Sequence, residues 1–170
     1  MAIAEQNQVN IRLGFREIKQ LTRKILEENM IVKPPIIAAE LILVSDLVVS
    51  CGTFKPEYEH ISGFLDIDNK KIVINAIDSP SQQNYTIAHE FGHYLLGHYQ
   101  EAEYAPLLRD SRAMKKTLLE QRASYFAANL LVPDMFLREY IDRYPLIEDY
   151  QLTRIFGVPL EIIRYRKRYL

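Results

Sequence analysis

The segment His89-Glu90-Phe91-Gly92-His93 is the part of the sequence with the clearest chemical potential. In a helix, two histidines four residues apart project from the same face, because one turn takes about 3.6 residues. Their imidazoles can then bind one zinc ion, with Glu90 beside the metal rather than in its coordination shell. Glu90 is placed to take a proton from the attacking water and to pass it to a leaving amine, as metal-assisted hydrolysis of a peptide bond requires. The alternative is a pair of helical histidines that bind no metal.

A zinc ion that keeps one position open for water needs a third protein ligand. One class of zinc peptidases supplies a histidine six residues after the second one, but Tyr99 stands at that position. His98 lies off the predicted helix face, so we expect it at the helix C-terminus or at the rim of the site. We expect His60 at the surface or in a substrate cleft. Glu120 is the stronger candidate, because it borders an apolar stripe on a later predicted helix, and its alternative is an ordinary solvated glutamate.

The segment that carries the two histidines has strong signals for a helix. Ser79 suits the N-cap, Pro80 suits the first turn, and Gln82 would complete a capping box. Gly97 is suited to end the helix. These signals predict a helix over residues 80–96.

Hydrophobic periodicity and turn residues predict the elements around this helix. Strands are expected at residues 47–51, 63–67 and 71–75, the last two as a hairpin. Further helices are expected at residues 9–28, 34–44, 111–131, 135–143, 146–156 and 159–168. Because the strands form a block between helices, the predicted fold class is α+β.

The composition limits the class of protein. The chain has 170 residues, 48% of them hydrophobic, which suits one domain with a buried core. The net charge of −1 gives no overall field that favours nucleic acid or a membrane. The lone cysteine, Cys51, excludes an internal disulfide and fits a reducing compartment. With no apolar signal segment and no apolar stretch long enough to span a membrane, a cytoplasmic protein without membrane contact is expected.

A peptide substrate is expected to bind at a strand edge. An extended peptide can add to a sheet and gain backbone hydrogen bonds. Residues 63–67 are the candidate because they shortly precede the metal-binding helix, and the alternative is an ordinary interior hairpin. The oxyanion also needs a hydrogen-bond donor besides the metal. Tyr94, Tyr104 and Tyr125 are candidates, and nothing in the sequence selects one.

Two linked segments resemble the ImmA/IrrE-type zinc metallopeptidases. The first is Ile87-Ala88-His89-Glu90-Phe91-Gly92-His93, and the second runs from Glu120 through Ala123, Phe126-Ala127-Ala128 and Leu130-Leu131-Val132-Pro133. The strand at Gly63 and the run Ile72-Val73-Ile74-Asn75 match as well, so the resemblance covers about residues 35–135.

This resemblance implies a thermolysin-like zincin core, with a small sheet packed on the metal-binding helix and Glu120 as the third zinc ligand. In this family the substrate is typically a helix-turn-helix transcriptional repressor, whose cleavage turns on phage, mobile-element or stress-response genes. The chain departs from the family at Arg122, where a second acid is often found, and at Ser124, where asparagine is usual. Ser124 lies one turn after Glu120, so it can still hydrogen-bond a metal-binding group.

The end of the chain is basic. The last twenty residues contain one acid, Glu161, against Arg154, Arg164, Arg166, Lys167 and Arg168. Residues 151–159 resemble the first helix and turn of a helix-turn-helix, and a basic second helix is one signature of DNA binding. Solvated charges on a helical subdomain, or a dock for the repressor, are the alternatives that we favour over DNA contact.

Two hypotheses follow for the whole chain. In both, residues 1–135 form the metallopeptidase-like core, and residues 136–170 form a helical tail that is either separate or part of the same domain. In the first, the chain is a zinc endopeptidase. In the second, it is a non-proteolytic regulator that binds a repressor or DNA through its tail, with a structural zinc. A structural zinc would have four protein ligands, whereas a catalytic one leaves a position for water.

Overall fold

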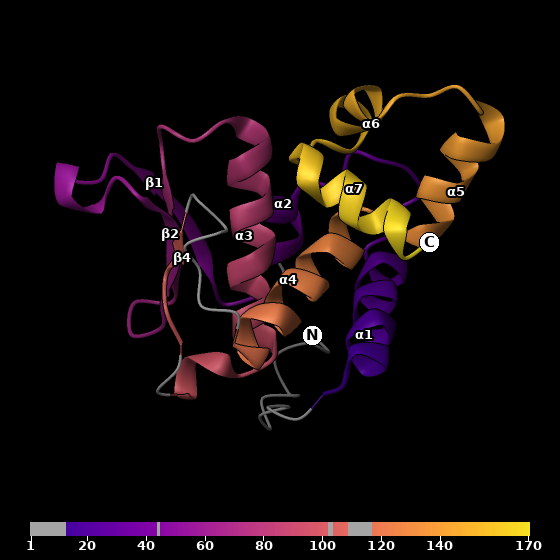
Figure 1. Ribbon diagram of the computed structural model, residues 1–170. Coiled ribbons are helices and arrows are strands. Elements are labelled where there is room, and N and C mark those ends of the chain that lie inside the picture. Colours follow the sequence, from indigo (N-terminus) through magenta and orange to yellow (C-terminus); the bar gives the residue numbers. More distant parts are fainter. Residues whose placement is uncertain (1–12, 44, 102–103, 109–116) are drawn as a thin grey trace.

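A computed structural model describes residues 13–43, 45–101, 104–108 and 117–170 of the chain. A small sheet lies on one side of the central helix α3 (Pro80–Leu95), and α4 (Leu118–Leu131) crosses its other side (Figure 1). The other helices are α1 (Phe15–Glu28), α2 (Ala38–Ile42), α5 (Asp134–Arg143), α6 (Asp149–Phe156) and α7 (Leu160–Arg168), with short 3-10 turns η2 (Pro56–Tyr58) and η3 (His98–Gln100). Together with the strands, these helices confirm the predicted α+β class.

The sheet has four strands in the order β1 (Val48–Gly52), β3 (Lys71–Asn75), β2 (Ile61–Asp66) and β4 (Leu107–Leu108). The predicted hairpin is confirmed, because β2 and β3 pair antiparallel, while β1 runs parallel to β3. The edge expected at residues 63–67 is occupied in part. Strand β4 pairs antiparallel with β2 on the side away from β3, opposite Ile61 and Gly63. A two-residue strand is too short to produce a periodic hydrophobic pattern, so β4 could not be predicted.

Helix α3 begins and ends where the sequence predicts. The Ser79 hydroxyl accepts a hydrogen bond from the Gln82 backbone N–H at 3.3 Å, as an N-cap does. The Gln82 side chain donates to the Thr86 hydroxyl at 3.5 Å, in place of the return contact of a capping box. Gly97 adopts a left-handed conformation with φ of 71°, which turns the chain into η3.

Helix α2 begins later than expected, at Ala38 instead of Pro34. The reason is a tertiary contact. The side-chain amide of Asn84, on α3, accepts from the Ala38 backbone N–H at 2.8 Å and donates to the Ile36 carbonyl at 2.9 Å. These two bonds hold residue 36 outside the helix and satisfy the first free N–H of α2.

The other helices lie close to their predicted positions. Helix α4 begins after Thr117, whose hydroxyl caps it by accepting from the Glu120 N–H at 3.2 Å. The predicted residues 9–12 and 111–116 lie outside the described part of the chain. Among the described residues, no helix is both long and apolar enough to cross a membrane.

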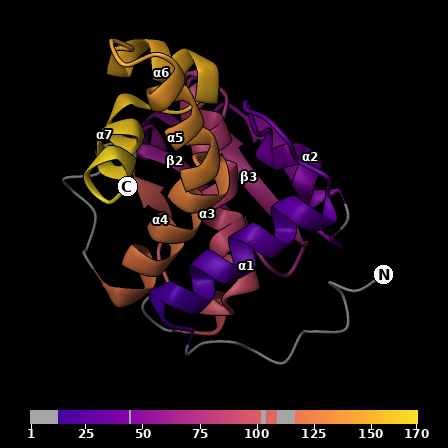
Figure 2. The same cartoon turned by 90° about the vertical axis from the view of Figure 1, so that its right-hand side faces the viewer.

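Helices α5, α6 and α7 share the hydrophobic core with the rest of the chain. Buried residues from α1 through α7 form one cluster that includes Leu137, Phe156 and Ile163. Figure 2 shows α1 passing in front of α4, with α5, α6 and α7 gathered at one end of α3. The Arg166 side chain of α7 is 1% exposed, and its Nε donates to the Val132 carbonyl at 2.9 Å. The tail is therefore packed directly against the end of α4.

Candidate metal centre

Three side chains from α3 and α4 bring possible metal ligands to one point. The Nε2 atoms of His89 and His93 lie 3.0 Å apart. The carboxylate oxygens of Glu120 lie 3.2 Å from Nε2 of His89 and 3.3 Å from Nε2 of His93. A tetrahedral zinc ion with bonds of about 2.0–2.1 Å holds its ligand atoms roughly 3.3–3.4 Å apart. The three residues are buried, and their separations suit one such ion.

The charge states of these groups also suit a cation. Burial lowers the pKa of His93 to about 4, so its imidazole is neutral near pH 7 and offers a lone pair. Burial by itself would raise the pKa of Glu120, but hydrogen bonds from His89 and His93 outweigh it and lower this pKa to about 2. Imidazole nitrogens and a carboxylate are a set of donors that zinc prefers. The residues therefore fit the metal that the sequence predicts.

Each histidine has a partner for its other ring nitrogen. Nδ1 of His89 lies 3.4 Å from the Ser124 hydroxyl, the contact expected from the position of Ser124. Nδ1 of His93 lies 3.1 Å from Nδ1 of His98. Such contacts fix the orientation of a metal-binding imidazole and decide which nitrogen carries the proton.

Of the two expected places of His98, the rim of the site is wrong, whereas the residue does follow the C-terminus of α3. The side chain is fully buried, because Gly97 turns η3 back under α3. It contacts the ring nitrogen of His93 that faces away from Glu120, so its role is to support His93 rather than to complete the triangle of ligand atoms. His60 is exposed, as one of its two expected locations requires.

Glu90 lies beside this triangle and is fully buried. Its Oε2 accepts a hydrogen bond from the Tyr104 hydroxyl at 3.0 Å, and its carboxylate also accepts one from the Leu107 backbone N–H. Burial raises the pKa of Glu90 well above its usual value, and the nearby charge of Glu120 acts in the same direction. A carboxylate with a raised proton affinity is a stronger base toward water.

The structure separates the three tyrosine candidates. Tyr104 lies nearest the site, since its hydroxyl contacts Glu90 and its ring packs edge-on against His93 with centroids 5.1 Å apart. The Tyr94 hydroxyl donates to Asp46, and the Tyr125 ring packs against Phe15. The sequence carries no signal that selects Tyr104, because the position of this residue depends on the pairing of β4 with β2.

A close contact between α3 and α4 sets the distance between the two histidines and Glu120. Gly92 faces Phe126, and a Cβ atom added to Gly92 would lie 2.9 Å from Cδ1 of Phe126. The helices can approach this closely because Gly92 has no side chain. Phe126 is fully buried, so it has little room to move away.

The basic charges of the tail are largely paired. Arg166 forms an ion pair with Asp134, while Arg164 and Lys167 pair with Asp149 at 3.6 Å and 2.7 Å. Asp134 and Asp149 precede the last twenty residues. The unpaired positive charge of the tail is therefore smaller than the composition of those twenty residues suggests. The pairing weakens the expectation of a DNA-binding face.

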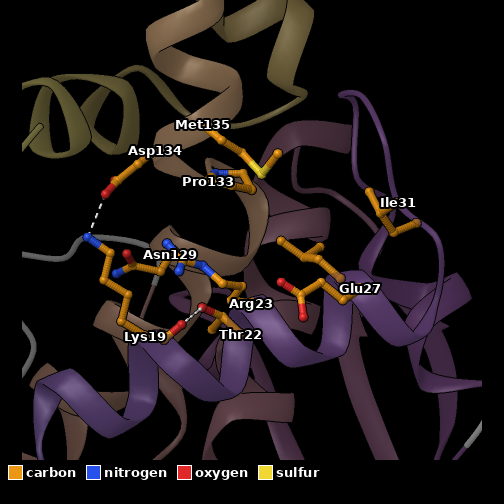
Figure 3. Close-up of a pocket in the computed structure, with 10 residues that line it drawn as sticks. Lys19, Thr22, Arg23, Glu27, Ile31, Asn129, Pro133, Asp134 and Met135 are labelled. Carbon is orange, nitrogen blue, oxygen red and sulfur yellow. Dashed lines mark hydrogen bonds and ion pairs between the residues drawn. The ribbon is translucent and has the colours of Figure 1, made fainter.

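A separate cavity of about 140 Å³ lies between α1 and the junction of α4 and α5 (Figure 3). Its wall carries both charges and apolar groups, and the Lys19 ammonium contacts the Asp134 carboxylate at 2.5 Å on one side. The lining residues are Lys19, Thr22, Arg23, Leu26, Glu27, Ile31, Asn129, Pro133, Asp134 and Met135. None of the three candidate ligands borders this cavity, so it is not the substrate cleft of the metal centre.

The fold is of the α+β class, and its buried site consists of side chains that could hold one metal ion. Residues 49–168 match the family model described as the IrrE N-terminal-like domain. This match covers most of the chain, so the chain belongs to the IrrE N-terminal-like family of peptidases, as its resemblance to ImmA/IrrE-type enzymes implies.

Two curated relatives share part of their length with this chain. Metallopeptidase ImmA of Bacillus subtilis (strain 168) is 27% identical over 114 residues, which cover 66% of each protein. Uncharacterized immunity region protein 2 of Bacillus phage phi105 is 28% identical over 107 residues, 62% of this chain and 65% of that protein. The chain thus spans slightly less than two thirds of either relative.

The fold is also found among solved structures. An example is a Mycobacterium tuberculosis transcriptional regulator, which superposes with a TM-score of 0.65 at 21% identity. The match covers 89% of this chain but 46% of that protein.

Proposed function

We propose that this chain is a zinc-dependent endopeptidase. His89, His93 and Glu120 hold the zinc ion, and Glu90 moves the proton. The observation that carries the proposal is the triangle of ligand atoms, 3.0 to 3.3 Å on each side, with a buried glutamate beside it. Three protein ligands leave one position open, which is the arrangement of a catalytic rather than a structural zinc.

The reaction divides between the metal and Glu90. A zinc ion held at this site supplies a Lewis acid and favours ionisation of water at neutral pH. Glu90 accepts a proton from the water that attacks the scissile carbonyl. It then returns that proton to the amine nitrogen as the peptide bond breaks, so the carboxylate is regenerated. His98 and Ser124 keep the two imidazoles oriented during this cycle.

The proposed substrate is a helix-turn-helix transcriptional repressor, cleaved in the cytoplasm to derepress phage, mobile-element or stress genes. The family resemblance supports this choice. Two names among the similar proteins point in the same direction, one from a phage immunity region and one a transcriptional regulator.

The test is to incubate the purified, zinc-loaded chain with the repressor encoded beside its gene. We expect a cut at one place in the repressor, identified from the intact masses of both fragments and prevented by a zinc chelator. Glu90→Gln should retain zinc and lower the cleavage rate about 10²–10⁴-fold, the usual contribution of a general acid–base group.

Two results would contradict the proposal. The first is an intact repressor in the presence of wild-type protein with full zinc occupancy. The second is complete derepression of the target genes by Glu90→Gln in cells, which would favour a non-proteolytic regulator that binds through its tail.

A further inference from the structure

The sheet edge beside the metal centre is already occupied by the chain itself. Strand β4 pairs antiparallel with β2, with Leu107 opposite Gly63 and Leu108 opposite Ile61. Further along β2, the Leu65 backbone N–H donates to the Tyr104 hydroxyl at 2.5 Å. Residues 104–108 therefore use the edge of β2 that an extended peptide would need.

Two of these five residues also hydrogen-bond the proposed catalytic glutamate, Glu90. The Tyr104 hydroxyl donates to Oε2 of Glu90 at 3.0 Å, and the Leu107 backbone N–H donates to the same carboxylate. A group that must receive a proton from water is thus hydrogen-bonded by the chain from two sides. A substrate backbone at this edge would compete for the same acceptor.

The metal centre is closed in this structure. His89, Glu90 and His93 are each 0% exposed, and Leu107 is 2% exposed. A polypeptide needs direct contact with the metal and the base, and two groups of residues 104–108 occupy the Glu90 carboxylate.

Few interactions hold residues 104–108 on the edge of β2. Strand β4 is two residues long, which gives few ladder hydrogen bonds to break. Ala105 and Pro106 are exposed, and Pro106 has no N–H to offer to a neighbouring strand. Leu107 is the segment's buried apolar side chain, so its burial is one favourable contribution to the closed state, beside the contacts of Tyr104.

We propose that residues 104–108 act as an internal competitor of the substrate. In the closed state they occupy the edge of β2 and hydrogen-bond Glu90. A substrate strand replaces them, pairing with β2 and placing an apolar side chain where Leu107 lies. This proposal rests on the proposed peptidase function and adds regulation of the same site, because any partner that draws residues 104–108 away would raise activity.

Two variants that act in opposite directions test the proposal. Leu107→Ala removes the buried anchor, and we expect it to raise repressor cleavage at least tenfold. Ile61→Cys with Leu108→Cys places two cysteines at paired positions, so oxidation should lock β4 onto β2 and lower cleavage at least 100-fold. Reduction with a phosphine should restore the rate. All variants carry Cys51→Ser, because Cys51 is exposed and could form other disulfides.

A second measurement does not depend on proteolysis. This measurement is the rate at which a chelator removes zinc from each zinc-loaded protein. We expect removal to be several-fold faster in Leu107→Ala and several-fold slower in the oxidised double-cysteine variant. Leu146→Ala is the matched control, because Leu146 is 95% exposed, and it should change neither rate.

The outcomes separate the two proposals. One outcome is that the rates of zinc removal and of cleavage are the same in Leu107→Ala, in the oxidised double-cysteine variant and in wild type. In that case residues 104–108 do not close the site, and the inference is wrong. If zinc removal changes in opposite directions as expected while no form cleaves the repressor, the closure is supported and the proposed substrate fails.

Discussion

The pair His93 and His98 shows how single residues prepare the metal centre. Nε2 of His93 faces Glu120, while its Nδ1 lies 3.1 Å from Nδ1 of His98. If Nδ1 of His93 carries the proton and donates it in a hydrogen bond to Nδ1 of His98, Nε2 of His93 keeps its lone pair, which is directed at the metal position. A buried histidine five residues after a predicted ligand is thus a support for that ligand.

We therefore expect His98→Ala to weaken zinc binding roughly 10–100-fold, the usual effect of removing a partner of a metal-binding histidine. Competition with a fluorescent chelator measures this affinity. The matched control is His60→Ala, which removes an exposed histidine and should leave the zinc affinity unchanged. The unfolding midpoint of the metal-free protein separates a local effect from a general loss of stability. An unchanged zinc affinity in His98→Ala would show that His93 needs no such support.

At the scale of elements, the spacing of α3 and α4 decides whether the ligand atoms meet. Glu120 is on α4, and both histidines are on α3, so any separation of the helices moves the carboxylate away from the imidazoles. The contact between Gly92 and Phe126 limits the distance between the two helices, because a Cβ at Gly92 would lie 2.9 Å from the phenyl ring.

Gly92→Ala is expected to destabilise the fold and to weaken zinc binding. Alanine favours a helix by about 1 kcal/mol over glycine, but overpacking costs about 1–3 kcal/mol, so the net effect is a loss of up to about 2 kcal/mol. Chemical denaturation measures the stability, and chelator competition measures the zinc affinity. Phe126→Leu in the same chain should restore part of both, by making room for the new methyl group.

Gly52→Ala is the matched control for this substitution, because a Cβ there would meet no atom within 4 Å. It should leave the zinc affinity at the wild-type value. Equal zinc affinities in Gly92→Ala and wild type would mean that α4 shifts without moving Glu120, against the expectation.

Local signals in the sequence predict the elements that carry the ligands, and they fail where distant contacts decide. Ser79 and Gly97 mark α3 correctly, and spacing on one helix face brings His89 and His93 together. The start of α2 depends on Asn84, which is 46 residues away from Ala38 in sequence. Strand β4 forms only by pairing with β2, from which it is separated in sequence by β3 and α3. The choice of Tyr104 follows from that pairing, so it could not be predicted either.

At the scale of the whole molecule, Arg166 connects the tail to the ligand-bearing helix. Its guanidinium lies in the interior, where it pairs with Asp134 and donates to the Val132 carbonyl at the end of α4. Asp134 also pairs with Lys19 of α1. One carboxylate thus connects α1, α5 and α7.

Asp134→Asn is expected to destabilise the protein by about 2–3 kcal/mol, because it leaves a buried guanidinium without its counter-charge. This estimate is below the full cost of breaking a buried pair, since Asp134 is partly exposed. Denaturant unfolding near pH 7 measures the loss. Asp149→Asn removes a surface carboxylate that pairs with Lys167 and should cost at most about 1 kcal/mol. Similar losses in the two variants would contradict the special role of Asp134.

The same pair predicts a dependence on pH. Burial raises the pKa of Asp134, but Lys19 and Arg166 outweigh burial and lower it below its ordinary value. A carboxyl group with a lowered pKa in the folded state stabilises the fold fully above its unfolded pKa of about 3.9. That contribution is lost as the pH falls through the lower folded value. The stability difference between wild type and Asp134→Asn should therefore be constant near neutrality and shrink below about pH 4.

Because His89, Glu90 and His93 are completely buried, the number of molecules with an accessible metal centre can differ from the total number of copies in a cell. A bulky reagent that reacts with the zinc or with Glu90 can label only molecules whose centre is uncovered. An antibody against the exposed surface around Leu146 detects every copy. The ratio of the two signals reports the uncovered fraction directly, without a substrate, and it should rise in the presence of a partner that draws residues 104–108 away, even if the total amount stays constant.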